Sequence, residues 1–216
     1  MKGDIIVVEE HHKRAAKKIV EEIIKTIKKK ERRYTITVAG ESGSGKSETA
    51  FAISGELEKY KIKSVLLGQD DYFFLPPKSN DKKRRQDPSW LGPHIEVKLD
   101  VLEDNIKAAI SGKSTIVKPL IDYDKNIIEQ ESVSLKNIDV VIAEGTYTTL
   151  LKNVDTKVFI ARNRMQTLEH RQKRNRGSEV GDPFVEEVLK TEHKIIAGHR
   201  QLADFVITNE YDVIVV

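Results

Sequence analysis

The chain has 216 residues, of which 38% are hydrophobic and 33% charged, with no cysteine and a formal net charge of +3. This length fits one α/β domain with a sizeable core, and the lack of cysteine excludes disulfides and thiolate metal sites. No apolar run is long enough for a membrane span and the first residues do not resemble a signal peptide, so we expect a cytoplasmic protein. The modest charge indicates neither a nucleic-acid nor a membrane partner, and a homo-oligomer is compatible with the sequence.

Residues 1–33 differ from the rest and are predicted to form an N-terminal extension. Within residues 10–33, alanine, valine and isoleucine recur at helical spacing between lysines and glutamates, which predicts one amphipathic helix. A basic amphipathic helix can also bind a membrane or a partner, but the glutamates at positions 9, 10, 21 and 22 favour packing on the domain. The neighbouring His11 and His12 lack further ligand spacing and are expected on the surface.

From residue 34 onward, short apolar runs alternate with helical patterns. Runs that are apolar on both faces indicate buried parallel strands, and the alternation predicts an α/β fold with a parallel sheet flanked by helices. The predicted strands are 34–39, 64–68, 115–117, 140–143, 158–160 and 205–207, with a last edge strand at 212–216. The predicted helices are 46–60, 99–111, 163–175 and 183–200.

The segment Gly40–Ser47 matches the phosphate-loop (P-loop) pattern G-x-x-x-x-G-K-[ST] and lies between a predicted strand and a predicted helix. A glycine-rich turn that precedes a lysine by chance is the alternative, which the flanking elements disfavour. In a P-loop, backbone N–H groups bind phosphate, Lys46 reaches the β- and γ-phosphates, and Ser47 ligates Mg²⁺. The pattern therefore predicts ATP and Mg²⁺ as ligands. The predicted nucleotide contacts are Gly40, Glu41, Ser42, Gly43, Ser44, Gly45, Lys46, Ser47 and Glu48.

Acidic residues follow two of the predicted strands. Asp70 and Asp71 come just after the strand 64–68, where residues of an open α/β sheet face the ligand crevice, and a plain polar turn is the alternative. Glu144 ends the strand 140–143, where P-loop proteins place an acid that orients the metal. We expect Glu144 to contact Mg²⁺ directly or through water, and the aspartates to supply a general base and a metal ligand.

Two further segments are candidates for substrate handling. Residues 74–96 are rich in proline and basic residues without a clear period, which predicts a long functional loop. Residues 162–177 carry several arginines, among them Arg171 and Arg174, that could neutralise a transferring phosphoryl group. A solvated basic face is the alternative for this second segment.

Taken together, these motifs resemble the uridine kinase and phosphoribulokinase family of P-loop kinases. The matching pieces, in the family's order, are 40–47, 69–73, 99–102, 118–123, 144–145, 171–177 and 203–207. The resemblance implies a nucleoside-kinase-like P-loop domain over residues 34–216, with an acceptor-binding loop at 74–96 and a lid at 163–182. It implies ATP-dependent phosphorylation of a hydroxyl group, in which Asp70 takes the proton of the acceptor. It also implies that Asp70 lies near the metal, together with Ser47 and Glu144. It further implies catalytic roles for Lys46, Arg171 and Arg174, a nucleotide contact by Arg176, and acceptor contacts by Asp71, Tyr72, His94, Glu96, Asp122 and Tyr123.

The acceptor stays open because two positions depart from the uridine kinase pattern. Ile121 stands where an aromatic residue usually precedes the aspartate, and residues 90–96 replace the usual ribose-binding stretch. A small-molecule acceptor is expected, either a nucleoside or sugar, or a sugar phosphate, glycerate or pantothenate-like acid. A P-loop ATPase or switch protein is the third reading. The guanine-specifying Asn-Lys-x-Asp motif is absent from the sequence, which disfavours a GTPase.

Overall fold

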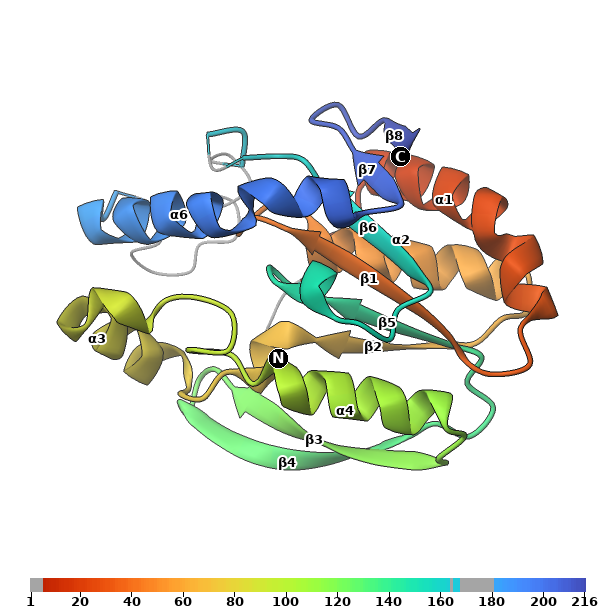
Figure 1. The fold of residues 1–216 in the computed structure, drawn as a ribbon, viewed down its shortest axis with the longest axis horizontal. Coiled ribbons are helices and arrows are strands. Elements are labelled where there is room, and N and C mark those ends of the chain that lie inside the picture. Colours follow the sequence, from red (N-terminus) through yellow and green to blue (C-terminus); the bar gives the residue numbers. More distant parts are fainter. Residues whose placement is uncertain (1–5, 164, 168–180) are drawn as a thin grey trace.

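A computed structural model of the chain describes residues 6–163, 165–167 and 181–216. Its centre is a six-stranded sheet in the order β2-β5-β1-β6-β7-β8 (Figure 1). The first five strands of this order pair in parallel, and β8 runs antiparallel to β7 at the edge. The strands are β1 (Tyr34–Gly40), β2 (Ser64–Gly68), β5 (Val140–Glu144), β6 (Thr156–Ile160), β7 (Phe205–Ile207) and β8 (Val213–Val215). The predicted parallel sheet with its late edge strand is thus confirmed.

Helices cover both faces of this sheet (Figure 1). Helices α1 (Glu10–Lys29) and α2 (Lys46–Lys59) bury their apolar residues against one face, and α4 (Leu99–Ile110) and α6 (Pro183–Ile196) pack on the other. Side chains of a strand alternate between faces, so Val140 and Ile142 join the first core while Val141 and Ala143 join the second. Short 3₁₀ turns occupy 69–72, 88–90, 148–150 and 197–202. No helix in the described ranges is long and apolar enough to span a membrane.

The structure corrects the strand predicted at 115–117. These residues begin β3 (Thr115–Asp122), which leaves the main sheet and pairs with β4 (Ile127–Ser134) as an antiparallel two-stranded sheet. Along the start of β3 the side chains alternate between exposed and buried, with Val117 59% exposed. That alternation is typical of a hairpin with one solvated face rather than of a buried parallel strand. β4 is mostly polar, so its sequence carries no apolar run that would reveal it.

The predicted long loop at 74–96 also needs correction, because it contains helix α3 (Pro77–Gln86). Pro77 starts this helix, where its missing N–H costs nothing, and Arg85 pairs with Asp81 one turn earlier. Asn80 is the only buried residue of α3, so the helix has no apolar stripe to give a periodic signal. Figure 1 shows α3 and the start of α6 reaching beyond the carboxyl ends of the parallel strands.

Helix α1 confirms the predicted amphipathic helix, but one of its histidines is not where we expected it. His12 is completely buried, whereas His11 keeps partial exposure. The ring of His12 lies against His11 and Tyr211, so its surroundings are set by the far end of the chain. Such a long-range contact leaves no trace in the local sequence.

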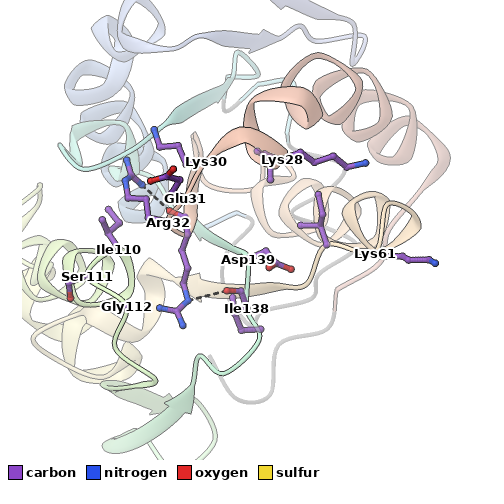
Figure 2. Close-up of a pocket in the computed structure, with 13 residues that line it drawn as sticks. Lys28, Lys30, Glu31, Arg32, Lys61, Ile110, Ser111, Gly112, Ile138 and Asp139 are labelled. Atoms are coloured by element: carbon purple, nitrogen blue, oxygen red, sulfur yellow. Dashed lines mark hydrogen bonds between the residues drawn. The ribbon is translucent and has the colours of Figure 1, made fainter.

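At the amino ends of the strands, a cavity of about 620 Å³ lies between the end of α1 and the end of α4 (Figure 2). Lysines line it, but Arg33 on its wall is fully engaged with backbone carbonyls. Its guanidinium donates to the carbonyl oxygens of Ala109 at 2.8 Å, Leu135 at 2.7 Å and Ile138 at 3.0 Å, and also to that of Lys113 at 3.0 Å. Arg33 therefore joins α4 to the segment that leads into β5.

Replacing Arg33 with methionine is expected to lower the free energy of unfolding by about 2–4 kcal/mol, because several carbonyls lose a charged donor. Arg85→Met is the control, since Arg85 is exposed and its ion pairs with Asp81 and Asp182 should contribute little to stability. Urea unfolding of both variants checks this. Equal stability of the two variants would contradict a structural role for Arg33.

Candidate active site

The P-loop connects the end of β1 to the start of α2 in a backbone path that needs glycine. Gly45 has φ +94°, in the left-handed region, and it precedes the first residue of α2. A Cβ at Gly40 would lie 2.7 Å from Ser44 Oγ and 2.9 Å from the carbonyl oxygen of Ile160. The loop is closed by a hydrogen bond from Ser44 N–H to Glu41 O at 3.1 Å. The conformation suits an anion held by loop N–H groups and the amino end of a helix.

Lys46 lies over this loop. Its ammonium donates to the carbonyl oxygen of Glu41 at 2.9 Å, which holds the charge at the loop rather than in solvent. The loop therefore carries the convergent backbone, the helix terminus and the cation that a triphosphate needs. These features fit the nucleotide that the sequence pattern predicts.

Ser47, Asp70 and Glu144 come from three elements and meet beside the loop. In the pairing of β2 with β5, Gly68 lies opposite Glu144, and Asp70 follows two residues later. Burial and the charge of Asp70 raise the pKa of Glu144 to about 7, against the lowering effects of Lys46 and a hydrogen bond from Ser47. Two carboxylates and a hydroxyl are the hard oxygen donors that Mg²⁺ prefers.

This donor set is smaller than a complete metal cage. Within the described ranges, no group of three or more His, Cys, Asp or Glu side chains could hold a metal by itself. Mg²⁺ usually keeps several waters and binds through one or two carboxylates and the phosphates of its substrate. The residues thus fit a Mg²⁺ ion that arrives with a nucleotide.

Next to Asp70 a cavity of about 470 Å³ opens between the P-loop, α3 and α6. Of the predicted acceptor contacts, Glu96 and Tyr123 line it. Glu96 is completely buried and accepts from Arg84 Nε at 2.7 Å and from Asn80 Nδ2 at 3.0 Å. The wall of the cavity is therefore preorganised by a buried ion pair. Other lining residues include Ser42, Gln69, Phe73, Lys78, Asp81, Ile121, Thr146, Tyr147, Leu189 and Glu192.

The other predicted acceptor contacts do not line this cavity, and their contact with an acceptor stays a prediction. Tyr72 is buried and its hydroxyl accepts from Asn105 Nδ2 at 3.0 Å. His94 is exposed at a turn with φ +61°. The carboxylate of Asp122 accepts from the N–H of Lys125 at 3.1 Å, within the β3–β4 turn.

Asp71, another predicted acceptor contact, does not line the cavity either. Its carboxylate is 3% exposed, pairs with Lys118 Nζ at 2.7 Å and accepts from Ile121 N–H at 3.0 Å. The 3₁₀ turn at 69–72 directs Asp70 and Asp71 differently, so Asp70 lines the cavity while Asp71 fastens the turn to β3. Sequence adjacency alone could not separate the two.

Two residues of α6 contact the P-loop and were not identified from the sequence. Glu192 is buried and accepts from the N–H of Ser42 at 2.7 Å and from its hydroxyl at 3.0 Å. His193 Nδ1 lies 2.5 Å from a carboxylate oxygen of Glu41. Burial raises the pKa of Glu192, while Lys46 and the Ser42 hydrogen bonds oppose this. In the sequence, Glu192 stands at helical spacing between the apolar Leu189 and Ile196. A charged residue on such an apolar face needs a polar partner, so this position could have been a signal.

At a pH well above the raised pKa of Glu192, Glu192→Gln is expected to tighten ATP binding by about 3- to 10-fold, because a buried negative charge beside a triphosphate repels it. The glutamine oxygen can still accept from Ser42 N–H, so the loop should keep its shape. Glu187→Gln on the same helix is the control, since Glu187 is exposed and pairs with Lys190. Titration calorimetry with Mg²⁺ and a non-hydrolysable ATP analogue measures the effect. Unchanged or weaker binding in Glu192→Gln would refute the repulsion.

The predicted lid arginines lie outside the described residues. Arg171, Arg174 and Arg176 belong to 168–180, so the lid at 163–182 stays a prediction. What the structure shows is its starting point, where Arg162 after β6 donates to the carbonyl oxygen of Gln166 at 2.8 Å.

The sheet, the P-loop and the acids at the strand ends define a protein of the P-loop kinase fold class. A family model described as phosphoribulokinase / uridine kinase family matches residues 35–182. The chain therefore belongs to the phosphoribulokinase and uridine kinase family, as the sequence motifs predict.

Several relatives show how far the similarity extends. The chain is 28% identical over 188 residues to the bifunctional alpha-galactosidase/sucrose kinase AgaSK of Mediterraneibacter gnavus, matching 82% of this chain and 20% of that protein. It is 30% identical over 133 residues to a uridine kinase of Ureaplasma parvum, matching 58% of this chain and 60% of the relative. The match thus spans less than two thirds of either relative. A D-glycerate 3-kinase structure from Cryptococcus neoformans has the same fold, with a TM-score of 0.61 at 15% identity over 92% of this chain and 97% of that chain.

Proposed function

We propose that the protein is an ATP-dependent kinase that transfers the γ-phosphoryl group to a hydroxyl of a small molecule. The observation that carries this proposal is the place of Asp70, which lines a cavity of about 470 Å³ and also lies beside Glu144 at the P-loop. A P-loop ATPase or switch does not need a cavity of metabolite size, nor a carboxylate that lies between such a cavity and the phosphates.

In the proposed reaction the P-loop N–H groups and Lys46 bind the phosphates, and the acceptor lies in the cavity next to Asp70. The acceptor oxygen forms the new bond to the γ-phosphorus, the bond to the ADP oxygen breaks, and Asp70 takes the hydroxyl proton. Mg²⁺, held by Ser47 and by Glu144 directly or through water, would neutralise charge on the phosphate oxygens. Arg171 and Arg174 are proposed to meet the transferring group and Arg176 the nucleotide.

The charges of the cavity favour a neutral, polyhydroxylated acceptor such as a free sugar or a nucleoside. Of the cations among its described lining residues, Arg84 is bound to Glu96 and Lys78 is exposed. Asp70, Asp81 and Glu192 add negative charge to the wall. A carboxylate or phosphate on the acceptor would find only the exposed Lys78 as an uncommitted cation on the described wall, whereas hydroxyl groups pair readily with carboxylates and amides. The names of the two relatives above, a sucrose kinase and a uridine kinase, point to acceptors of this neutral kind.

Release of ADP by purified protein, measured across matched acceptors, tests the proposal. The panel pairs neutral sugars and nucleosides with glycerate, pantothenate and sugar phosphates. We expect turnover with a neutral member that exceeds the rate without acceptor by at least about 10²-fold. The best rate with an anionic acceptor would overturn the acceptor class, and no acceptor-dependent rate in a panel this broad would overturn the kinase proposal.

A further inference from the structure

The tight turn that joins β7 to β8 holds a tyrosine in a backbone conformation that favours glycine. Thr208 N–H donates to the carbonyl oxygen of Asp212 at 2.8 Å, and Tyr211 N–H donates to that of Thr208 at 3.1 Å. Tyr211 has φ +62°, which for a bulky side chain is an outlier. Glycine or asparagine usually fills such a hairpin position. The strained tyrosine suggests that its side chain is needed where it lies.

The hydroxyl of Tyr211 connects the P-loop to Arg162, in the segment that follows β6. It accepts from Arg162 Nη1 at 2.7 Å and lies 3.3 Å from the carbonyl oxygen of Ser44, to which it donates. The guanidinium of Arg162 also lies over the Tyr211 ring, 5.0 Å from its centroid. Burial raises the pKa of Tyr211, so the hydroxyl keeps the proton that it donates to Ser44.

This hydrogen bond sets the direction of a P-loop amide. The carbonyl of Ser44 and the N–H of Gly45 belong to one planar trans peptide and point in opposite directions. Holding the Ser44 carbonyl outward against Tyr211 therefore turns the Gly45 N–H away from Tyr211. The bond to the carbonyl also polarises the peptide and strengthens its N–H as a donor.

His12 of α1 closes the same side of the loop. Its Nδ1 accepts from the N–H of Glu9 at 3.1 Å, so in the neutral ring the proton is on Nε2. A Cβ placed on Gly45 would lie 2.9 Å from His12 Nε2 and 2.7 Å from the Tyr211 hydroxyl. The two side chains thus fill the space directly behind Gly45.

Helix α1 is fastened to the turn on both sides of Tyr211. Arg14 donates to the carbonyl oxygen of Glu210 at 2.9 Å, and Lys18 donates to that of Val213 at 2.6 Å. The rings of His11 and Tyr211 lie 3.9 Å apart between centroids. Core packing of the isoleucines of α1 explains why the helix is attached, but it does not require these contacts to converge behind Gly45.

We propose that α1 and the β7–β8 turn form a rear wall for the P-loop, and that Tyr211 and His12 are positioning residues for the nucleotide. This inference deepens the proposed function and rests on its nucleotide site. In it, the N-terminal extension is part of the phosphate-binding machinery, and Arg162 links that wall to the segment that follows β6.

Calorimetric titration with Mg²⁺ and ADP tests this on the full chain, because ADP binding needs no acceptor. Tyr211→Phe keeps the ring and removes only the hydroxyl. We expect its dissociation constant for ADP to rise about tenfold, the loss of one buried hydrogen bond. Tyr34→Phe is the matched control, since the Tyr34 hydroxyl also makes a buried hydrogen bond, to Thr156 at 2.7 Å and far from the P-loop. This control should lose thermal stability without a change in ADP affinity.

A second variant tests the contribution of α1 to the rear wall. His12→Asn can still accept from Glu9 N–H but withdraws the ring from Gly45, and we expect weaker ADP binding here too. Wild-type affinity in Tyr211→Phe, or an equal loss in Tyr211→Phe and Tyr34→Phe, would overturn the rear wall alone. Absence of ADP binding in the wild type would instead overturn the nucleotide site and the proposed function with it.

Discussion

Lys46→Ala is expected to lower kcat/KM for ATP by at least about 10²-fold while leaving the fold intact. Lys46 is held at the P-loop by the carbonyl of Glu41, so its charge is already placed for the β- and γ-phosphates. Removing it withdraws stabilisation from the bound nucleotide and more from the transition state, where phosphoryl charge shifts toward the leaving oxygen. Steady-state kinetics with the best acceptor of the panel measures the loss.

The control for this variant is Lys59→Ala at the other end of α2. Lys59 is largely exposed, and its ion-pair partner in the described part of the chain is Glu56. Its removal should leave kcat/KM within about twofold of the wild type, as for a surface pair. A Lys46→Ala enzyme that keeps more than about a tenth of wild-type kcat/KM would show that the loop is not the phosphate site.

Asp70→Asn is expected to lower kcat by about 10²- to 10⁴-fold and to change the dissociation constant for ADP by only a few fold. Asparagine keeps the size of the side chain but cannot take the acceptor proton. Asp70 lines the acceptor cavity, so the loss should appear in the chemical step rather than in folding. Single-turnover measurements with saturating ATP separate that step from binding.

Asp71→Asn gives the opposite pattern and is the matched control. Its carboxylate is buried against Lys118, which also pairs with Glu131 at 3.0 Å, so loss of the Asp71 charge should cost about 1–3 kcal/mol of stability. We expect a lower melting temperature, with kcat per folded molecule much closer to the wild type than in Asp70→Asn. If Asp71→Asn were instead the stable and inactive variant, the two aspartates would have exchanged roles.

The features that could be predicted from the sequence are those that local residues determine. Buried parallel strands need runs that are apolar on both faces, so β1 and β5 were recognisable, and the P-loop needs its glycines because of backbone geometry. The helical spacing in α1 reflects its packing on the core and was equally clear.

Other features depend on contacts between distant residues. α3 is held by charge pairs, by a hydrogen bond that Asn80 donates to Glu96 and by one that Asn80 accepts from Trp90 Nε1, none of which creates a hydrophobic period. The distinction between Asp70 and Asp71 follows from the rotation of one 3₁₀ turn, and it becomes visible only with Lys118 in place. Glu192 and Tyr211 reach the P-loop from far along the chain, so the loop motif does not predict them.

The family resemblance predicted the class of the site but not which residues line its cavity. The pattern of apolar strands had already placed Asp70 and Glu144 at the carboxyl ends of β2 and β5, and the resemblance added the roles expected of them. It did not provide for the Arg84–Glu96 pair, which removes a free cation from the acceptor cavity and thereby favours a neutral acceptor. Arg84 belongs to α3, a helix that could not be recognised from the sequence pattern.

Transfer of the labelled γ-phosphoryl group of ATP tests the central claim most directly. The protein is incubated with Mg²⁺, γ-labelled ATP and the best neutral acceptor, and the products are separated by charge, with Lys46→Ala and Asp70→Asn run in parallel. The proposed function predicts that label leaves ATP and appears in a phosphorylated acceptor for the wild type, and that both variants lose this product. Label that appears only as inorganic phosphate, at a rate indifferent to the acceptor, would contradict the assignment as a kinase.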